Sequence, residues 1–486
     1  MKNAALNTVT PAPGMPGDAV ASKRAGMITL SLIVLFSIKP AADLLWAESF
    51  FTIAGRPISL LHVMGVLVFV YFGRYLFTDI RHSAPYAGLF KLFIAWNVVS
   101  IVFTSFYAEI SLIQIVDLLL RIVDSYIVYN VAFFAARGNV EHDQYRIIKA
   151  VSIGTFVALV INLLAIKMGY GGIKLSSNMT LREHGLYHDP GTLSNIALYN
   201  LIFTSFLYHL LPKKKPVWLI YGAITSVLSL YLIYLGLSRA VMVQLVVFGL
   251  IYVGIFKKGL GRFATLSFMA VVIVAGALLG LNYGRYTQRF QSEIMVFENP
   301  QELEHAKQDK DVNFGIYERL GSNRGQLIAY ALDDFLKRPP AQQAIGDITV
   351  SPSHSDYIDI LSRNGFVGLL IYLVFLFMIW RKTLMLIVTG TKQQGWAMDV
   401  LAFTLFNLYI LYSVPFRPLS YTTLSWFMWA VIGYSFGRRY WIAQSVKSPK
   451  SSGIRSQRPS LSTGKPDLNA MNRTRGAGIS SHARRR

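Results

Sequence analysis

The feature that most constrains this chain is a series of apolar blocks, each roughly twenty residues long and nearly free of charged side chains. In an α-helix, about 20 apolar residues cross about 30 Å of hydrocarbon. A membrane barrel would show shorter segments that alternate between polar and apolar residues. Only 15% of the 486 residues are charged and 53% are hydrophobic, whereas soluble domains have about 25% charged residues. The sequence therefore predicts an all-α, polytopic membrane protein.

We expect about twelve transmembrane helices, of which the first is interrupted by Lys39-Pro40 and Asp43. The predicted spans are 27–46, 58–73, 88–106, 113–135, 147–166, 192–211, 217–236, 240–256, 263–281, 365–380, 396–413 and 419–436. They divide the chain into an N-terminal segment (1–26), nine spans (27–281), a large periplasmic loop (282–364), three spans (365–436) and a tail (437–486).

Basic residues predict the orientation, because cytoplasmic loops carry an excess of lysine and arginine. One alternating set of loops holds 18 basic residues, or 30 with the tail, and the short loops of the other set hold seven. We therefore expect both termini in the cytoplasm and the chain in the inner membrane. The 282–364 loop is then extracytoplasmic, and such a length is uncommon unless a loop is functional.

The net charge of +22 is concentrated in the tail, where 12 basic residues follow Gly437 against the single acid Asp467. The tail is rich in Ser, Gly and Pro, so we expect it to be disordered. An anionic inner leaflet attracts such a tail by about 1 kcal/mol per basic residue. Contact with the lipid bilayer is our interpretation, and binding of RNA or another partner is the alternative. We expect no nucleic-acid ligand.

Two parts of the large loop have helical signals. Apolar residues recur at helical spacing between Ser322 and Pro339, which predicts an amphipathic helix. Ser353 and Asp356 have capping-box spacing, which predicts that His354 lies in the first turn of a helix. Gly365 and Gly368, one turn apart, would let another helix approach closely.

Charged groups inside the spans suggest function by default. Asp117, Arg121 and Asp124 fall on one face of the fourth span. A structural charge pair is our interpretation, and a proton or solute path is the alternative. Asp309 and Asp311 have the Asp-x-Asp pattern of metal-dependent glycosyltransferases, but we interpret them as part of a solvated loop. We expect no metal and no cofactor.

Four motifs together resemble the O-antigen ligase and polymerase superfamily, over roughly residues 182–380. The main one is His354-Ser355, nine residues, then Gly365-x-x-Gly368. The others are Gly236-Leu-Ser-Arg239-Ala, with Ala240 where the family has Gly; Ser322-Asn-Arg324 before the amphipathic helix; and Arg182-Glu-His-Gly-Leu-Tyr-His-Asp-Pro190, with Gly191 where Asn is more usual. The first five spans match the family only in hydropathy.

The resemblance implies a glycosyltransferase that moves a glycan from an undecaprenyl diphosphate donor to a hydroxyl of a glycan acceptor outside the membrane. His354 would be the general base, because histidine titrates near neutral pH. Four arginines would bind the diphosphate, because the guanidinium fork matches phosphate oxygens: Arg239, Arg324, Arg319 and Arg182. The transfer would be metal-independent and would invert the anomeric centre.

Within the superfamily we favour a polymerase that joins repeat units into exopolysaccharide or O-antigen, with a flippase and a chain-length regulator as possible partners. The alternatives are a ligase that transfers glycan to lipid A–core, a relative that glycosylates proteins and, from another class, a glycolipid transporter. A transporter would concentrate polar groups at mid-membrane, whereas the candidate residues here cluster at the predicted outer side.

The orientation can be tested with topology reporters fused at Lys214 and at Lys307. We expect a cytoplasmic signal at Lys214 and an extracytoplasmic signal at Lys307, because the basic residues of the short loops favour that arrangement. Matching signals at the two positions would contradict the twelve-span topology.

Overall fold

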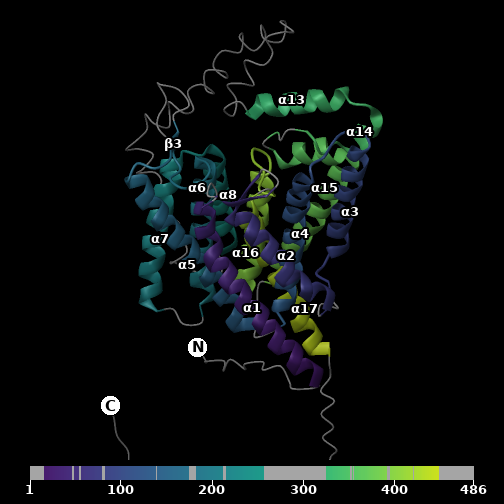
Figure 1. Cartoon of the computed structure of the whole chain (residues 1–486). Coiled ribbons are helices and arrows are strands. Elements are labelled where there is room, and N and C mark those ends of the chain that lie inside the picture. Colours follow the sequence, from purple (N-terminus) through teal and green to yellow (C-terminus); the bar gives the residue numbers. More distant parts are fainter. Residues whose placement is uncertain are drawn as a thin grey trace, which may run out of the picture. The chain divides into compact units, whose positions relative to one another are not determined.

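The computed structural model describes most of the chain. The described residues are 16–45, 49–53, 56–78, 83–137, 140–173, 182–211, 215–256, 324–350, 353, 355–390, 395–419 and 421–447. The chain divides into two compact units, Met1–Ile442 and Ala443–Arg486. Nearly all of the described part of the first unit is helical (Figure 1).

Helices coincide with eleven of the twelve predicted spans, and the ninth predicted span, 263–281, lies outside the described residues. They are α1 (Pro16–Ala42), α2 (Leu60–Thr78), α3 (Ala87–Ser105), α4 (Leu112–Ala135), α5 (Val140–Lys167), α6 (Pro190–Leu210), α7 (Pro216–Gly236), α8 (Arg239–Phe256), α15 (Asp356–Gly390), α16 (Trp396–Tyr412) and α17 (Thr422–Lys447). Six described helices are long and apolar enough to cross a membrane, and α2, α8 and α16 contain shorter apolar stretches. The membrane class of the chain is supported, and the number twelve stays a prediction.

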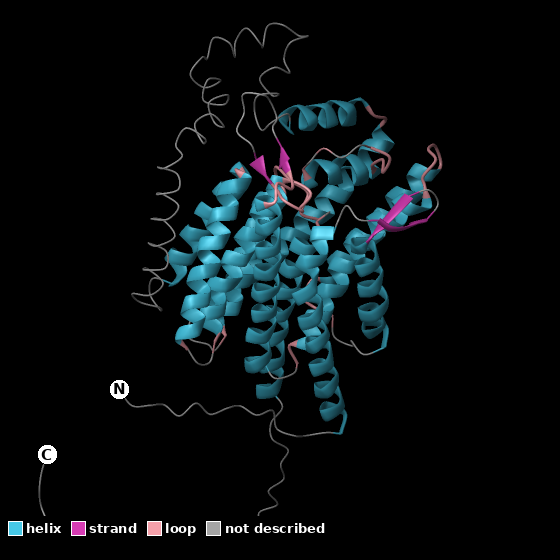
Figure 2. Cartoon of the chain, turned by 60° about the vertical axis from the view of Figure 1, so that its left-hand side comes forward, coloured by secondary structure: helices cyan, strands magenta, loops and turns pink. Residues whose placement is uncertain are grey.

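Short strands are the main departure from the all-helical prediction. β1 (Ser49–Ile53) pairs antiparallel with β2 (Arg56–Ser59), and β3 (Gly172–Ile173) pairs with β4 (Arg182–Glu183). Both small sheets lie in connections between helices (Figure 2). Strands of two to five residues leave no hydrophobic periodicity long enough to be detected in the sequence.

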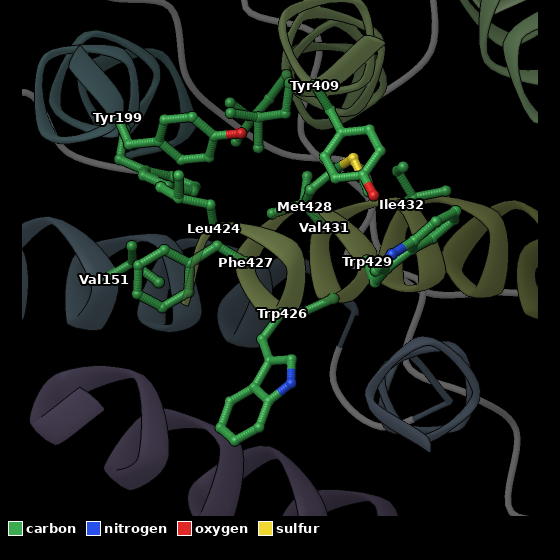
Figure 3. Close-up of a cluster of buried hydrophobic side chains, with 14 of the residues drawn as sticks. Val151, Tyr199, Tyr409, Leu424, Trp426, Phe427, Met428, Trp429, Val431 and Ile432 are labelled. Atoms are coloured by element: carbon green, nitrogen blue, oxygen red, sulfur yellow. The ribbon is translucent and has the colours of Figure 1, made fainter. Parts of the chain in front are cut away.

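The core lies around α17, whose buried side chains point to several neighbouring helices (Figure 3). Trp426 points toward α1, and Trp429 stacks on Phe375 of α15 with ring centroids 5.4 Å apart. Two glycines bring α17 against the backbone of α4. An added Cβ at Gly433 or Gly437 would lie 2.2 Å from a carbonyl oxygen of that helix. Small residues permit this kind of close helix approach.

α15 is kinked at Gly365, where φ is 66° and ψ is −177°. The kink frees the carbonyl of Asn364, which accepts a hydrogen bond of 2.8 Å from the indole nitrogen of Trp96 on α3. An added Cβ at Gly368 would lie 2.8 Å from Cδ1 of Trp96. The predicted close approach of a helix at this glycine pair is therefore confirmed, and the predicted start of the tenth span coincides with the kink.

The predicted helix between Ser322 and Pro339 is observed as α13 (Arg324–Lys337). A second helix, α14 (Pro340–Ile345), follows directly and begins with proline at its first position. Pro339-Pro340 therefore ends one helix, as predicted, and also begins the next, because proline suits the first helical turn. In Figure 1, α13 lies across the bundle at the end where α15 begins.

α17 continues to Lys447, ten residues beyond the predicted start of the tail at 437. Arg438 is 2% exposed and bonds both oxygens of Asp399 on α16, each at 2.9 Å. Arg439 pairs with the same carboxylate. These two tail arginines are therefore part of the helical bundle, and the tail after Lys447 lies outside the described residues.

The kink predicts the effect of replacing Gly365 by alanine. The backbone angles are almost exclusive to glycine, and a non-glycine residue there costs about 1–3 kcal/mol. The added Cβ would also lie 2.2 Å from the carbonyl oxygen of Ala344. We expect Gly365→Ala to lower the melting temperature of the purified protein. Gly88→Ala is the control, because that Cβ has nothing within 4 Å. Equal melting temperatures for the two variants would contradict the role of the kink.

Candidate functional site

A cavity of about 330 Å³ lies where several helix ends meet. Its walls come from Asp43 after α1, from Ser59 and the first turns of α2, from the starts of α6 and α17 and from the connections that precede those two helices. These are parts that the sequence predicts to face outward. A further wall comes from residues 117–124, which lie in the second to fourth turns of α4 and reach toward the middle of its predicted span. Its charged lining residues are Asp43, Asp117, Arg121, Asp124 and Arg417. We refer to it as the main cavity.

Asp117 and Arg121 form an ion pair, with Nη2 of Arg121 2.7 Å from Oδ2 of Asp117, and the structural role of the three charged residues stays a prediction. Both side chains are about one-third exposed, at 35% and 36%, so this contact adds little to stability. Asp124, the third member of the predicted group, lines the cavity at 1% exposure. Neither of its carboxyl oxygens has a hydrogen-bond partner among the described residues.

The end of α1 is tied to the start of α17 beside this cavity. The Lys39 ammonium contacts the Asp43 carboxylate and donates to Oγ1 of Thr423 at 2.6 Å. Thr423 in turn donates to Asp43. Lys39 is fully buried, and a buried charge is tolerated only with such partners. Lys39 and Asp43, which interrupt the first predicted span, therefore connect the end of α1 to the start of α17 and fix one wall of the cavity.

The loop from Arg182 to Asp189 forms another wall. Asp189 caps α6 by accepting from the backbone nitrogens of Gly191 and Thr192 at 2.7 and 3.0 Å. The same carboxylate accepts from the Tyr421 hydroxyl at 3.2 Å. This cap holds the loop to α6 and to the start of α17, and it sets the position of the loop's last residues at the cavity.

Tyr187 is the buried residue of this loop that lines the cavity, at 1% exposure. Its hydroxyl has no hydrogen-bond partner among the described residues. Burial, and to a smaller extent the Asp43 carboxylate, raise the pKa of the Tyr187 hydroxyl well above its usual value. The hydroxyl therefore stays protonated at physiological pH and remains a hydrogen-bond donor in a residue that lines the cavity.

The structure brings two of the predicted arginine elements together. Nε of Arg182 donates to the carbonyl of Gly236 at 3.2 Å, and that glycine ends α7 three residues before Arg239 begins α8. Leu237, between the two helices, has a φ of 45°, which makes the turn sharp. Arg182 and Arg239 are both half-buried and do not line the main cavity.

The other predicted site residues are only partly covered. His354 and Arg319 lie outside the described residues. Arg324 is the first residue of α13, and only its backbone is described. On either side of position 354, Ser353 and Ser355 are both buried.

Buried hydrogen bonds hold these flanking serines. Asp359 accepts from the backbone nitrogen and the hydroxyl of Ser353 at 2.5 and 2.8 Å. The hydroxyl of Ser355 donates to the carbonyl of Ser413 at 3.2 Å. The capping box predicted between Ser353 and Asp356 was wrong: α15 begins at Asp356, so position 354 precedes the helix, and Ser353 bonds to Asp359 instead.

Asp359 also connects this segment to the main cavity. Its second oxygen lies 3.4 Å from Nη1 of Arg417, which lines the cavity. Arg417 is the only basic residue that the sequence places between the last two predicted spans. That isolation was a signal for function, but the sequence motifs did not include this arginine.

A second cavity of about 290 Å³ shares Asp117 and Arg121 with the first. Its lining includes Arg363 and residues 348–350, which lead toward position 354. Arg363 donates to the carbonyl of Val350 at 3.3 Å. The main cavity is thus linked to the start of α15 through Arg417 and Asp359, and the second cavity through Arg363. Among the described residues, the structure contains no group of three His, Cys, Asp or Glu that could hold a metal ion.

Comparison with known families supports the predicted resemblance. Residues 224–373, roughly a third of the chain, match the family model described as O-antigen ligase. The matched range contains Arg239, Arg324, His354 and the glycine pair of α15. A search among curated proteins finds no match to the chain. The resemblance to the O-antigen ligase and polymerase superfamily is confirmed.

The hydrogen bonds around Ser353 predict how this segment responds to loss of Asp359. In Asp359→Leu the backbone nitrogen of Ser353 loses its acceptor, and an unsatisfied buried donor costs about 1–3 kcal/mol. We expect hydrogen exchange at Ser353 and Ser355 to accelerate roughly tenfold or more, measured by mass spectrometry on the full-length protein. Asp347→Leu is the control, because that carboxylate bonds only within its own turn among the described residues. Unchanged exchange in Asp359→Leu would show that the segment is held by other contacts.

Proposed function

We propose that this protein is a membrane glycosyltransferase that polymerises undecaprenyl diphosphate–linked oligosaccharide units on the outer side of the inner membrane. The observation that carries the proposal is the O-antigen ligase match over 224–373. In the described part of that range, Arg363 of α15 lines the second cavity, and Asp359 of α15 contacts Arg417, which lines the main cavity. The product would be an exopolysaccharide or an O-antigen.

The donor site is proposed to include Arg239 and Arg324, with Arg182 and Arg319 as further candidates. The leaving group carries the charge of a diphosphate, and arginine binds phosphate oxygens with two parallel hydrogen bonds. The contact between Arg182 and the end of α7 supports a shared role for Arg182 and Arg239. Guanidinium groups placed there would stabilise the charge that develops on the departing diphosphate.

His354 is proposed as the general base. The neutral imidazole takes the proton of the acceptor hydroxyl while that oxygen forms a bond to the anomeric carbon. The bond between this carbon and the diphosphate oxygen breaks, and undecaprenyl diphosphate leaves with the electron pair. Attack from the face opposite the leaving group inverts the anomeric centre. The buried bonds of Ser353 and Ser355 would limit the movement of the segment that carries this base.

The second candidate function is that of a ligase, which transfers the finished glycan to lipid A–core. The description of the matched family favours it. The donor chemistry is the same in both cases, so the acceptor distinguishes them. A polymerase accepts a second lipid-linked repeat unit, and a ligase accepts the lipid A–core saccharide.

The mechanism predicts different defects for two variants, measured with purified protein in nanodiscs and an undecaprenyl diphosphate–linked glycan. His354→Ala should still bind the donor, but transfer should fall by ~10²–10⁴, as is typical for a lost general base. Arg239→Lys keeps the charge and loses the guanidinium fork, so donor binding and turnover should both weaken. Chelators should have no effect on transfer.

The control is Arg381→Lys, which makes the same chemical change at an exposed position of α15 and should leave both measurements unchanged. A fully active His354→Ala enzyme would contradict the mechanism. Loss of activity with EDTA and its recovery with a divalent cation would instead support a metal-dependent mechanism that uses Asp309 and Asp311. Movement of labelled lipid-linked glycan across the bilayer without transfer would identify a transporter.

A further inference from the structure

The main cavity contains two buried polar groups whose hydrogen-bonding capacity is unused. The carboxyl oxygens of Asp124 and the hydroxyl of Tyr187 have no partner among the described residues. Both side chains are 1% exposed and both line the cavity. Burying such groups without partners costs several kcal/mol in a closed interior. Two of them at one cavity therefore indicate a ligand that supplies hydrogen bonds.

The shape of the cavity leaves room beside Asp124. Gly65 on α2 lies directly against this carboxyl, and an added Cβ at Gly65 would be 3.2 Å from Oδ2 of Asp124. The same Cβ would be 3.0 Å from Leu120. A cavity of about 330 Å³ is within the range of small-molecule sites, which begins near 300 Å³.

The charges around the cavity favour a neutral ligand. Arg121 pairs with Asp117 at 2.7 Å and Arg417 with Asp359 at 3.4 Å. The nearby Lys39 pairs with Asp43. The cations are therefore already matched by carboxylates, while Asp124 has no matching cation within hydrogen-bond distance among the described residues. A carboxylate on the ligand would place a second acidic group beside Asp124, whereas a hydroxyl group of the ligand can donate a hydrogen bond to Asp124.

We propose that the main cavity binds an uncharged sugar residue of the glycan, with Asp124 and Tyr187 bonded to its hydroxyl groups. The inference rests on the proposed function and adds a subsite to it. The arginines of the donor site bind the diphosphate, and this cavity selects the sugar. Aromatic side chains with a polar end, here Tyr187 and Tyr421, suit a ligand that has both apolar faces and hydroxyl edges.

The test measures equilibrium binding to the full-length protein in nanodiscs. The probes are undecaprenyl diphosphate without sugar, a panel of neutral disaccharides, and matched disaccharides that contain a uronic acid. Wild type should prefer the neutral sugars. Asp124→Leu should weaken their binding about 10- to 100-fold, and Tyr187→Phe about 2- to 10-fold. Binding of undecaprenyl diphosphate should stay unchanged in both variants.

The melting temperature of Asp124→Leu shows whether this variant folds. If it does not, Asp124→Asn replaces it in the binding measurements, because asparagine preserves the shape of the side chain. Ser125→Ala is the control, because Ser125 is buried on the same helix, bonds to Ser425 at 2.8 Å and does not line the cavity. It should bind sugars as wild type does. Gly65→Ala should weaken sugar binding by narrowing the space at Asp124.

The two proposals fail in different ways. Failure of wild type to bind any sugar of the panel, a preference for uronic acids, or unchanged sugar binding in Asp124→Leu and Tyr187→Phe would each overturn the sugar site. Equal weakening of sugar and undecaprenyl diphosphate binding would also overturn it, since a general structural defect explains that result. Sugar binding that depends on Asp124 without any transfer activity would support the sugar site and contradict the proposed function.

Discussion

The packing of α17 against the surrounding helices is the interaction on which the rest of the structure depends. Its side chains from Trp426 to Phe436 are buried on all sides. In a membrane, lipid tails are as apolar as these side chains, so helices associate through close packing and polar contacts. The glycines at 433 and 437 supply the packing against α4. The Asp399 cluster and the contact of Lys39 with Thr423 supply polar contacts to α16 and α1.

The same arrangement explains why the candidate site lies where the helix ends converge. Backbone that is not helical needs hydrogen-bond partners other than those of a helix. The loop from Arg182 to Asp189 and the segment before α15 are both non-helical, and their polar groups bond to caps and neighbouring carbonyls. Irregular segments held in this way present side chains at fixed positions beside those that the helices supply, such as Asp124 of α4.

The sequence predicted helix positions well because each span needs a long apolar block, and that signal is strong. It predicted a close helix approach at Gly365 and Gly368, because small residues permit it, and only the structure identifies α3 as a neighbour. It did not predict the tie between Lys39 and Thr423, because a contact between residues 384 positions apart leaves no local pattern. Tyr187 and Arg417 were not predicted as site residues, although Tyr187 lies in the quoted 182–190 motif and Arg417 is the only basic residue of its predicted loop. Their positions at the cavity depend on neighbours that only the fold supplies. The roles of His354, Arg319 and Arg324 rest on the resemblance and stay predictions.

The contacts among Lys39, Asp43 and Thr423 have a consequence for biogenesis. They connect the first described helix of the chain to the last one. Spans enter the membrane in the order in which they are synthesised, so α1 carries a lysine without its hydroxyl partner until α17 has been inserted. Until then the main cavity also lacks the wall that Tyr421, Thr422 and Leu424 provide. A nascent or truncated chain that ends before α17 therefore has no complete cavity, and the site comes into existence only when synthesis of the bundle is finished.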